Sequence, residues 1–288
     1  MSNKKLCIAI PASVVSDTPH LREKTAKIGL IGRAAAIFRV NEIIIYPDNP
    51  KVSQTRDMNL VAALLAYMET PQYLRKRLFK LEPELQYAGV LPPLRTLHHP
   101  LNCRMKDLKT GEFREGVTLS RTKEGMLTDI GVEQPALVLD TALPIGKRIT
   151  VKITETAGQV VAKRANRDEI PDYWGYVVTV EKRTFGKIVK SGSFDLVVAT
   201  SKFGASFASV AEKLDERWSK AEKVLVAFGS PARGLYDIAK SEGVRLDDVV
   251  DFVVNTVPSQ GTETVRTEEA VVASLAIFNT YFCATKPS

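Results

Sequence analysis

The chain of 288 residues is long enough for one large or two modest domains, and its 44% hydrophobic and 25% charged residues exclude a disordered tail. Forty Lys and Arg against 33 Asp and Glu give a net charge of +7, which favours polyanionic partners such as nucleic acid. Three widely separated cysteines exclude a disulfide scaffold and favour a reducing, cytoplasmic location.

Targeting and membrane segments are not expected. The apolar run that ends at Pro11 is shorter than the core of a signal peptide. The longest apolar stretch, Ala270 to Phe282, contains Ser274 and Asn279 and is well short of the ~20 residues that cross a bilayer. We therefore expect neither secretion nor a membrane span.

The first ninety or so residues alternate between strand and helix patterns. Short apolar runs predict buried strands, and apolar residues at spacings of three and four predict helices. The predicted strands are Lys5–Ala12 and Glu42–Tyr46, and the predicted helices are Leu21–Val40, Thr55–Glu69 and Tyr73–Leu81. This β-α-β-α order predicts parallel strands with helices packed on the faces of the sheet.

The pattern changes after Leu91. Short alternating runs follow, separated by Gly, Asp and Pro, with almost no helical period. These runs include Thr118–Arg121, Ala136–Leu139, Arg148–Ile153 and Tyr176–Val180. They predict a small β-barrel or sandwich inserted over residues 93–185.

Strand and helix alternation then resumes to the end of the chain. The predicted strands are Leu196–Thr200, Lys223–Phe228 and Phe252–Asn255, and the predicted helices are Phe207–Trp218, Leu235–Ser241 and Glu268–Tyr281. The fold class is therefore α/β, with one discontinuous domain formed by residues 1–92 and 186–288 on either side of the β insert.

Two polar segments follow predicted strands in the C-terminal part. Val226–Leu235 (VAFGSPARGL) contains a Gly-Ser-Pro turn, and Asn255–Glu269 (NTVPSQGTETVRTEE) lies between a buried strand and an apolar helix. Loops at the carboxyl ends of parallel strands are where α/β folds bind ligands. The alternatives are an ordinary turn in the first segment and, at Thr267, Glu268 and Glu269, the capped start of a helix.

These segments carry a family resemblance. The run NTVPSQGTETVRTEEAVVASLAIFN, with AFGSPARGL upstream and KIGLIGRAAAIFRVNEIIIYPD near the N-terminus, resembles the SPOUT class of S-adenosylmethionine-dependent RNA methyltransferases, in the archaeal and eukaryotic branch with an OB-like insert. The resemblance implies a mainly parallel sheet with a C-terminal trefoil knot. It also implies a homodimer whose active site is completed at the subunit contact.

The resemblance further implies that loops after three successive strands hold S-adenosylmethionine, largely through backbone groups. Carried onto this chain, the expected cofactor residues are Thr200, Ser201, Phe228, Gly229, Ser230, Gly234, Val257, Pro258, Gln260, Gly261 and Val265. Glycine and proline suit such loops because the backbone itself makes the contacts.

Methyl transfer to a base nitrogen such as uridine N3 requires positioned substrates, loss of a proton and stabilisation of developing negative charge. Arg33 and Arg266 are the candidates for charge stabilisation or phosphate binding, and Glu263 is the candidate for proton transfer. The alternative for Arg33 is a solvated helix arginine, and for Glu263 a residue without a catalytic role.

The β insert contains the expected RNA contacts, since small barrels bind single strands through basic grooves and aromatic rings. The candidates are Lys163, Arg164, Arg167 and Trp174, with a core position as the alternative for Trp174. No metal site is predicted, because His98, His99 and Cys103 do not have the spacing of a zinc site.

The sequence therefore predicts a methyltransferase of ribosomal or transfer RNA. Uridine N3 is the first expected target atom and a ribose hydroxyl the second. A non-catalytic RNA-binding ribosome-assembly factor of the same fold is the principal alternative, because a fold does not fix a function. A protein methyltransferase is a third possibility.

Overall fold

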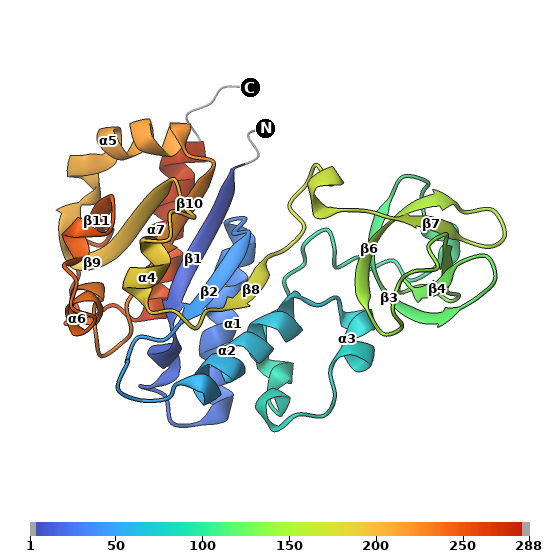
Figure 1. Cartoon of the computed structure of the whole chain (residues 1–288), viewed down its shortest axis with the longest axis horizontal. Helices are drawn as coiled ribbons and strands as arrows, with labels where there is room; N and C mark the ends of the chain where they lie inside the picture. Colours follow the sequence, from blue (N-terminus) through green and yellow to red (C-terminus); the bar gives the residue numbers. More distant parts are fainter. Residues whose placement is uncertain (1–3, 284–288) are drawn as a thin grey trace. The chain divides into compact units, whose positions relative to one another are not determined.

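The computed structural model describes residues 4–283, which form two compact units (Figure 1). Among the described residues, the first unit contains 4–66, 87–92 and 176–283, and the second contains 67–86 and 93–175. Within the described residues, no helix is both long and apolar enough to cross a bilayer.

A six-stranded parallel sheet organises the first unit, in the order β11-β9-β10-β1-β2-β8. The strands are β1 (Lys5–Pro11), β2 (Glu42–Tyr46), β8 (Val177–Val180), β9 (Leu196–Ser206), β10 (Lys223–Ala227) and β11 (Phe252–Asn255). Because all six strands are parallel, their carboxyl ends meet at one edge of the sheet.

Helices cover both faces of this sheet, as parallel sheets require. They are α1 (Leu21–Ile37), α2 (Thr55–Glu69), α4 (Phe185–Val189), α5 (Phe207–Lys220), α6 (Leu235–Ser241) and α7 (Thr267–Cys283). Residues of α4 and α6 form one core cluster with Cys7 and Ala9 of β1. Ile8 and Ile10 point to the opposite face and are also fully buried. In Figure 1, α1 and α7, which pack against each other, lie behind the sheet.

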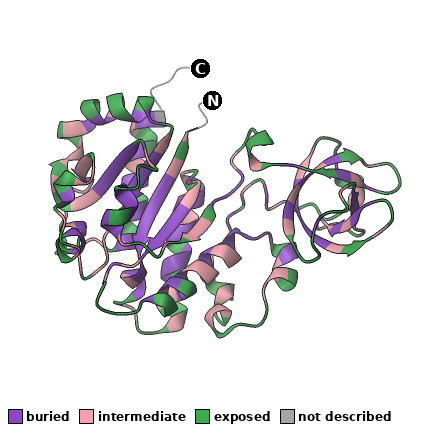
Figure 2. Cartoon of the chain, in the orientation of Figure 1, coloured by how far each residue is buried: buried purple, intermediate pink, exposed green. Residues whose placement is uncertain are grey.

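The second unit contains a closed five-stranded barrel in the order β3-β4-β5-β7-β6, together with helix α3 (Gln72–Leu78). The strands are β3 (Phe113–Arg121), β4 (Met126–Asp129), β5 (Ala136–Val138), β6 (Arg148–Glu155) and β7 (Val161–Arg164). Alternate residues of β6, Ile149, Val151 and Ile153, point into the barrel and are buried there. Figure 2 shows buried strands at the centre of each unit.

The predicted parallel sheet and the predicted barrel are therefore both present, but one strand belongs to a different sheet. The strand expected at Tyr176–Val180 forms β8, which pairs with β2 in the parallel sheet through Ile43 opposite Val178. Alternation of side chains predicts a strand without naming its partner. The second unit consequently ends at Gly175, whereas the sequence placed the end of the insert at residue 185.

Candidate functional site

The loop after β10 is a tight turn that begins at a buried residue. Phe228 is fully buried, and its carbonyl accepts a hydrogen bond of 2.7 Å from the Tyr46 hydroxyl at the end of β2. The backbone N–H of Ser230 donates to the carbonyl of Arg233 at 2.9 Å, closing the turn. At Gly229, a Cβ would lie 3.0 Å from the Arg233 carbonyl oxygen. Glycine therefore permits the two ends of the turn to approach each other closely.

Side chains from two other segments donate to this part of the chain. Thr200, in the middle of β9, donates its hydroxyl to the carbonyl of Ala227 at 2.9 Å. Thr267, the first residue of α7, donates its hydroxyl to the carbonyl of Gly229 at 2.9 Å. Ser201 is half-buried beside Thr200. The expected first and second loops are therefore joined to each other and to the start of the last helix.

The loop after β11 is folded on its own polar groups. Gln260 donates its amide to the Glu263 carbonyl at 3.0 Å, and its backbone N–H donates to the Val257 carbonyl at 3.3 Å. Lys202 of β9 also donates to the Glu263 carbonyl, at 3.3 Å, which joins the first loop to the third. Gly261 is exposed, with no atom within 4 Å of where a Cβ would be. Among the other expected cofactor residues, Pro258 and Gly234 are exposed and Val265 is half-buried.

The three candidate catalytic residues occupy different elements. Glu263 and Arg266 are exposed in the third loop, and the backbone N–H of Arg266 is capped by the Glu269 carboxylate at 2.9 Å. Arg33 is half-buried in the second half of α1, the helix that packs against α7. The helix-start interpretation of Thr267–Glu269 is thus confirmed, because α7 begins at Thr267 and Glu269 caps the N–H of Arg266, while the Thr267 hydroxyl also contacts the second loop.

A buried ion cluster beside this site was not predicted. The Lys27 ammonium of α1 lies 2.7 Å from Asp17 Oδ1 and 3.4 Å from Glu268 Oε2, and both Lys27 and Glu268 are only 6% exposed. Burial raises the pKa of Asp17, but the hydrogen bond and charge of Lys27 outweigh it, so that pKa is lowered. The sequence offered one signal for this buried cluster. Lys27 lies one helical turn from Ile31 and two turns from Ala34, on the apolar side of the helix.

The four RNA candidates differ in accessibility. Lys163 and Arg164 are exposed at the end of β7. Arg167 donates to Glu69 Oε1 at 3.0 Å. Trp174 is only 8% exposed, and its indole N–H donates to Glu115 at 2.6 Å. This placement corresponds to the core alternative for Trp174, because a buried ring in this position offers no face to a base.

A polar network lies on the outer side of β3 and β6 in the second unit. Arg148 donates to Glu69 Oε2 and to Glu115 Oε2, both at 2.6 Å. The Nε2 atoms of His98 and His99 lie 2.9 and 2.8 Å from the Glu69 carbonyl oxygen. Burial raises the pKa of Glu69, but contacts with His98 and Arg148 outweigh it and lower that pKa to about 2. Burial, together with the neighbouring His98, lowers the pKa of His99 to about 4.

The fold and these loops define an α/β protein with a candidate ligand site at the carboxyl edge of a parallel sheet. A family model described as "Putative RNA methyltransferase" matches residues 5–278. The chain belongs to this family, which confirms the predicted class of enzyme.

Relatives cover nearly the whole chain. An uncharacterised protein of Halobacterium salinarum is 31% identical over 93% of this chain and 96% of its own length. The 28S rRNA (uridine-N(3))-methyltransferases of Drosophila melanogaster and Homo sapiens are 32% and 31% identical to this chain, and each aligns with 94% of it. The alignment covers 61% of the Drosophila protein and 77% of the human protein. The structure of "putative methyltransferase Lpg2936" from Legionella pneumophila, with bound cofactor SAM, aligns with 97% of this chain and 67% of its own, at 9% identity and a TM-score of 0.36.

Proposed function

We propose that the protein transfers a methyl group from S-adenosylmethionine to N3 of a uridine in ribosomal RNA. The observation that carries this proposal is the joining of three loops at one sheet edge by the side chains of Thr200, Thr267 and Lys202. The relatives that act on uridine N3 of 28S rRNA support the substrate, because they align with 94% of this chain.

The loops suit the cofactor because their backbone is uncovered at two glycines. At Gly234 and Gly261, no atom lies within 4 Å of an ideal Cβ position, so a ligand edge can come directly against the main chain. When bound, S-adenosylmethionine supplies the electrophilic methyl group. Thr200, Ser201 and the turn from Phe228 to Gly234 would hold one side of the cofactor, and residues 257–261 with Val265 would hold the other.

The protein's own groups then position the uridine and manage its charge. Uridine N3 must lose its proton for its electron pair to accept the methyl group that bound S-adenosylmethionine would supply. Glu263 is the proposed proton acceptor, since it is exposed on a loop held at its backbone by Gln260 and Lys202. Arg33 and Arg266 are proposed to stabilise the anionic base or hold a phosphate.

The finer fold assignment is also a proposal. We propose the SPOUT class with a trefoil knot, supported by the strand order in which β11 and β10 flank β9, so that the loops after all three strands converge. We further propose that the barrel is OB-like, supported by its five strands, its closed order and its parallel pair β5 and β7. Lys163 and Arg164 would contact RNA phosphates there.

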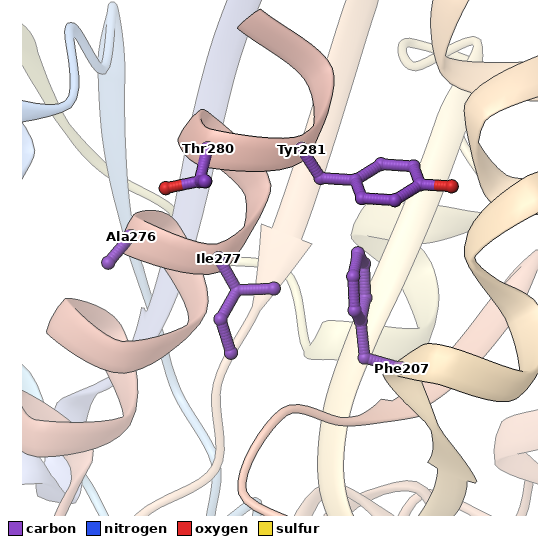
Figure 3. Close-up of a pocket in the computed structure, with 5 residues that line it drawn as sticks. All are labelled: Phe207, Ala276, Ile277, Thr280 and Tyr281. Carbon is purple, nitrogen blue, oxygen red and sulfur yellow. The ribbon is translucent and has the colours of Figure 1, made fainter. Parts of the chain in front are cut away.

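We propose a homodimer that uses the outer side of α7. Val272, Ala276 and Thr280 lie one turn apart on this helix, and Val272 is 43% exposed. A hollow of about 320 Å³ opens beside them, and Figure 3 shows the side chains that line it, Phe207, Ala276, Ile277, Thr280 and Tyr281.

Sedimentation equilibrium tests this dimer. Ile277→Asp, in the hollow, should give monomers, whereas Val52→Asp, at a 57% exposed position, should leave the dimer intact. A monomeric parent protein would contradict the proposal.

The enzymatic proposal is tested by incubating the protein with labelled S-adenosylmethionine and total ribosomal RNA. Nucleoside mass spectrometry should identify 3-methyluridine. A ribose-methylated product would move the target to the hydroxyl, and label that resists ribonuclease would indicate a protein substrate. Binding of RNA with no label transferred would favour an RNA-binding assembly factor.

A further inference from the structure

The middle of β9 departs from its ladder with β11. Val253 of β11 lies opposite Ala199, and the next residue, Val254, lies opposite Ala205, so residues 200–204 of β9 have no partner in β11 and form an excursion from this ladder. The base of this excursion is tight: a Cβ on Gly204 would lie 2.7 Å from the carbonyl carbon of Val253. Glycine is therefore required for the backbone to return to the ladder.

The excursion presents an aromatic ring to solvent. Phe203 is 74% exposed, although its backbone N–H is anchored to the Ser201 hydroxyl at 3.2 Å. The Lys202 carbonyl accepts the Asn255 amide at 3.0 Å, and the Lys202 ammonium donates to the Glu263 carbonyl at 3.3 Å. The end of β11 and the third loop thus both contact the residue next to the ring.

A cation accompanies the ring. The Lys202 ammonium lies 5.2 Å from the centroid of Phe203. An exposed aromatic face combined with a lysine is the pairing by which proteins bind single-stranded nucleic acid, with bases stacked on the ring and phosphates near the cation. Both tryptophans, in contrast, are only 8% exposed.

We propose that Phe203 is a stacking platform for a base of the RNA substrate next to the methylated nucleotide, with Lys202 beside the connecting phosphate. The inference rests on the proposed function and adds a positioning residue to it. The ring belongs to the same excursion as Thr200 and Ser201, and Lys202 contacts the loop of Glu263, so a base stacked on Phe203 would lie next to the proposed reaction centre.

The test compares three substitutions at the exposed ring. Phe203→Ala removes the side chain, Phe203→Leu keeps apolar volume without an aromatic face, and Phe203→Trp keeps the face. Tyr87→Ala, at an aromatic residue that is 37% exposed, is the matched control. Binding of fluorescein-labelled oligouridylate is measured by anisotropy, S-adenosylmethionine binding by calorimetry, and KM and kcat with ribosomal RNA.

Phe203→Ala and Phe203→Leu should both weaken oligouridylate binding roughly 5- to 150-fold, the loss expected for one stacked base. They should raise KM for RNA and leave cofactor affinity unchanged. Phe203→Trp should retain binding, and its added indole fluorescence should be quenched by oligouridylate. Lys202→Met should reduce the slope of log K against log salt by about 0.7, the value for one phosphate of a single strand.

Other outcomes overturn the inference. Normal binding by Phe203→Leu would reduce the role of Phe203 to apolar bulk, and loss of cofactor affinity would assign the ring to the cofactor. Dissociation of the oligomer by Phe203→Ala would assign it to a contact between copies. Unchanged RNA binding in all variants of an active enzyme refutes the stacking role alone, whereas Phe203-dependent binding without methyl transfer refutes the proposed function alone. A parent protein that binds no oligouridylate refutes the stacking role, and the proposed function is refuted only if that protein also transfers no methyl group to ribosomal RNA.

Discussion

Replacing Arg148 by methionine should destabilise the second unit by ~3 kcal/mol at neutral pH. The substitution leaves Glu69 and Glu115, which are 6% and 3% exposed at their side chains, without the cation that lies 2.6 Å from each. Breaking a buried ion pair by removing one partner costs ~3–5 kcal/mol, and the 22% exposure of Arg148 favours the lower end.

The pKa of Glu69 gives a magnitude for its polar partners together, because, against the effect of burial, the hydrogen bond from His98 and the charge of Arg148 both lower it. That pKa lies at about 2, below its ordinary value of 4.5, which corresponds to ~3 kcal/mol of stability. Because the pKa is lowered in the folded state, this stability is fully present above pH 4.5 and is lost as the pH falls toward 2. The deficit caused by Arg148→Met should therefore shrink as the pH falls below 4.5, because a protonated Glu69 no longer requires a cation.

Urea unfolding followed by Trp174 fluorescence measures this effect in a Trp218→Phe background, where Trp174 is the remaining tryptophan. Arg77→Met is the matched control, because Arg77 pairs with Asp129 at 2.5 Å but is half exposed. An exposed pair contributes under ~1 kcal/mol. Equal losses in Arg148→Met and Arg77→Met, or an Arg148→Met loss that is independent of pH, would refute the reasoning.

Three further predictions concern single positions. Gly175→Ala should lower the stability of the second unit by ~1–3 kcal/mol in calorimetry, since Gly175 has φ +79° and a Cβ would lie 2.5 Å from Cε1 of His98; an unchanged melting temperature would contradict this. Gly261→Trp should abolish calorimetric binding of S-adenosylmethionine without altering the circular dichroism spectrum, and retained binding would remove the third loop from the cofactor site. Arg33→Ala should abolish methyl transfer to ribosomal RNA while RNA affinity persists; a fall in affinity alone would make Arg33 a binding residue.

Local periodicity predicted the α/β elements closely. The expected bounds of β2, β11, α2 and α6 agree with the structure, because each element has a clear apolar period and a turn at both ends. The barrel was harder, since β4 and β7 have only four residues each and were not predicted. Their pairing depends on neighbours that lie far away in the chain.

Side-chain burial was the main property that the sequence could not supply. Trp174 was an equally reasonable stacking residue until Glu115, from β3, was found to accept its indole N–H. Charged residues are mostly exposed, and Glu69 and Arg148 are distant in sequence. Nothing in the sequence therefore indicated that they form a buried ion pair. The motif residues of the three loops could be identified from the sequence because each motif is a short continuous segment. The hydrogen bonds between the loops could not be predicted, because they join segments that are distant in the chain.

The Lys27 cluster, formed by Lys27, Asp17 and Glu268, shows how this limit affects the candidate site itself. The helix dipole alone explains a glutamate at the start of a helix. The sequence therefore offered no reason to expect a partner for Glu268 from another segment. Burial changes that interpretation, because Glu268 Oε2 has no hydrogen-bond partner among the described residues and its nearest cation is Lys27 of α1. A buried carboxylate without a cation is costly. The pairing therefore couples the position of α1, which carries Arg33, to the start of α7, which follows the third loop.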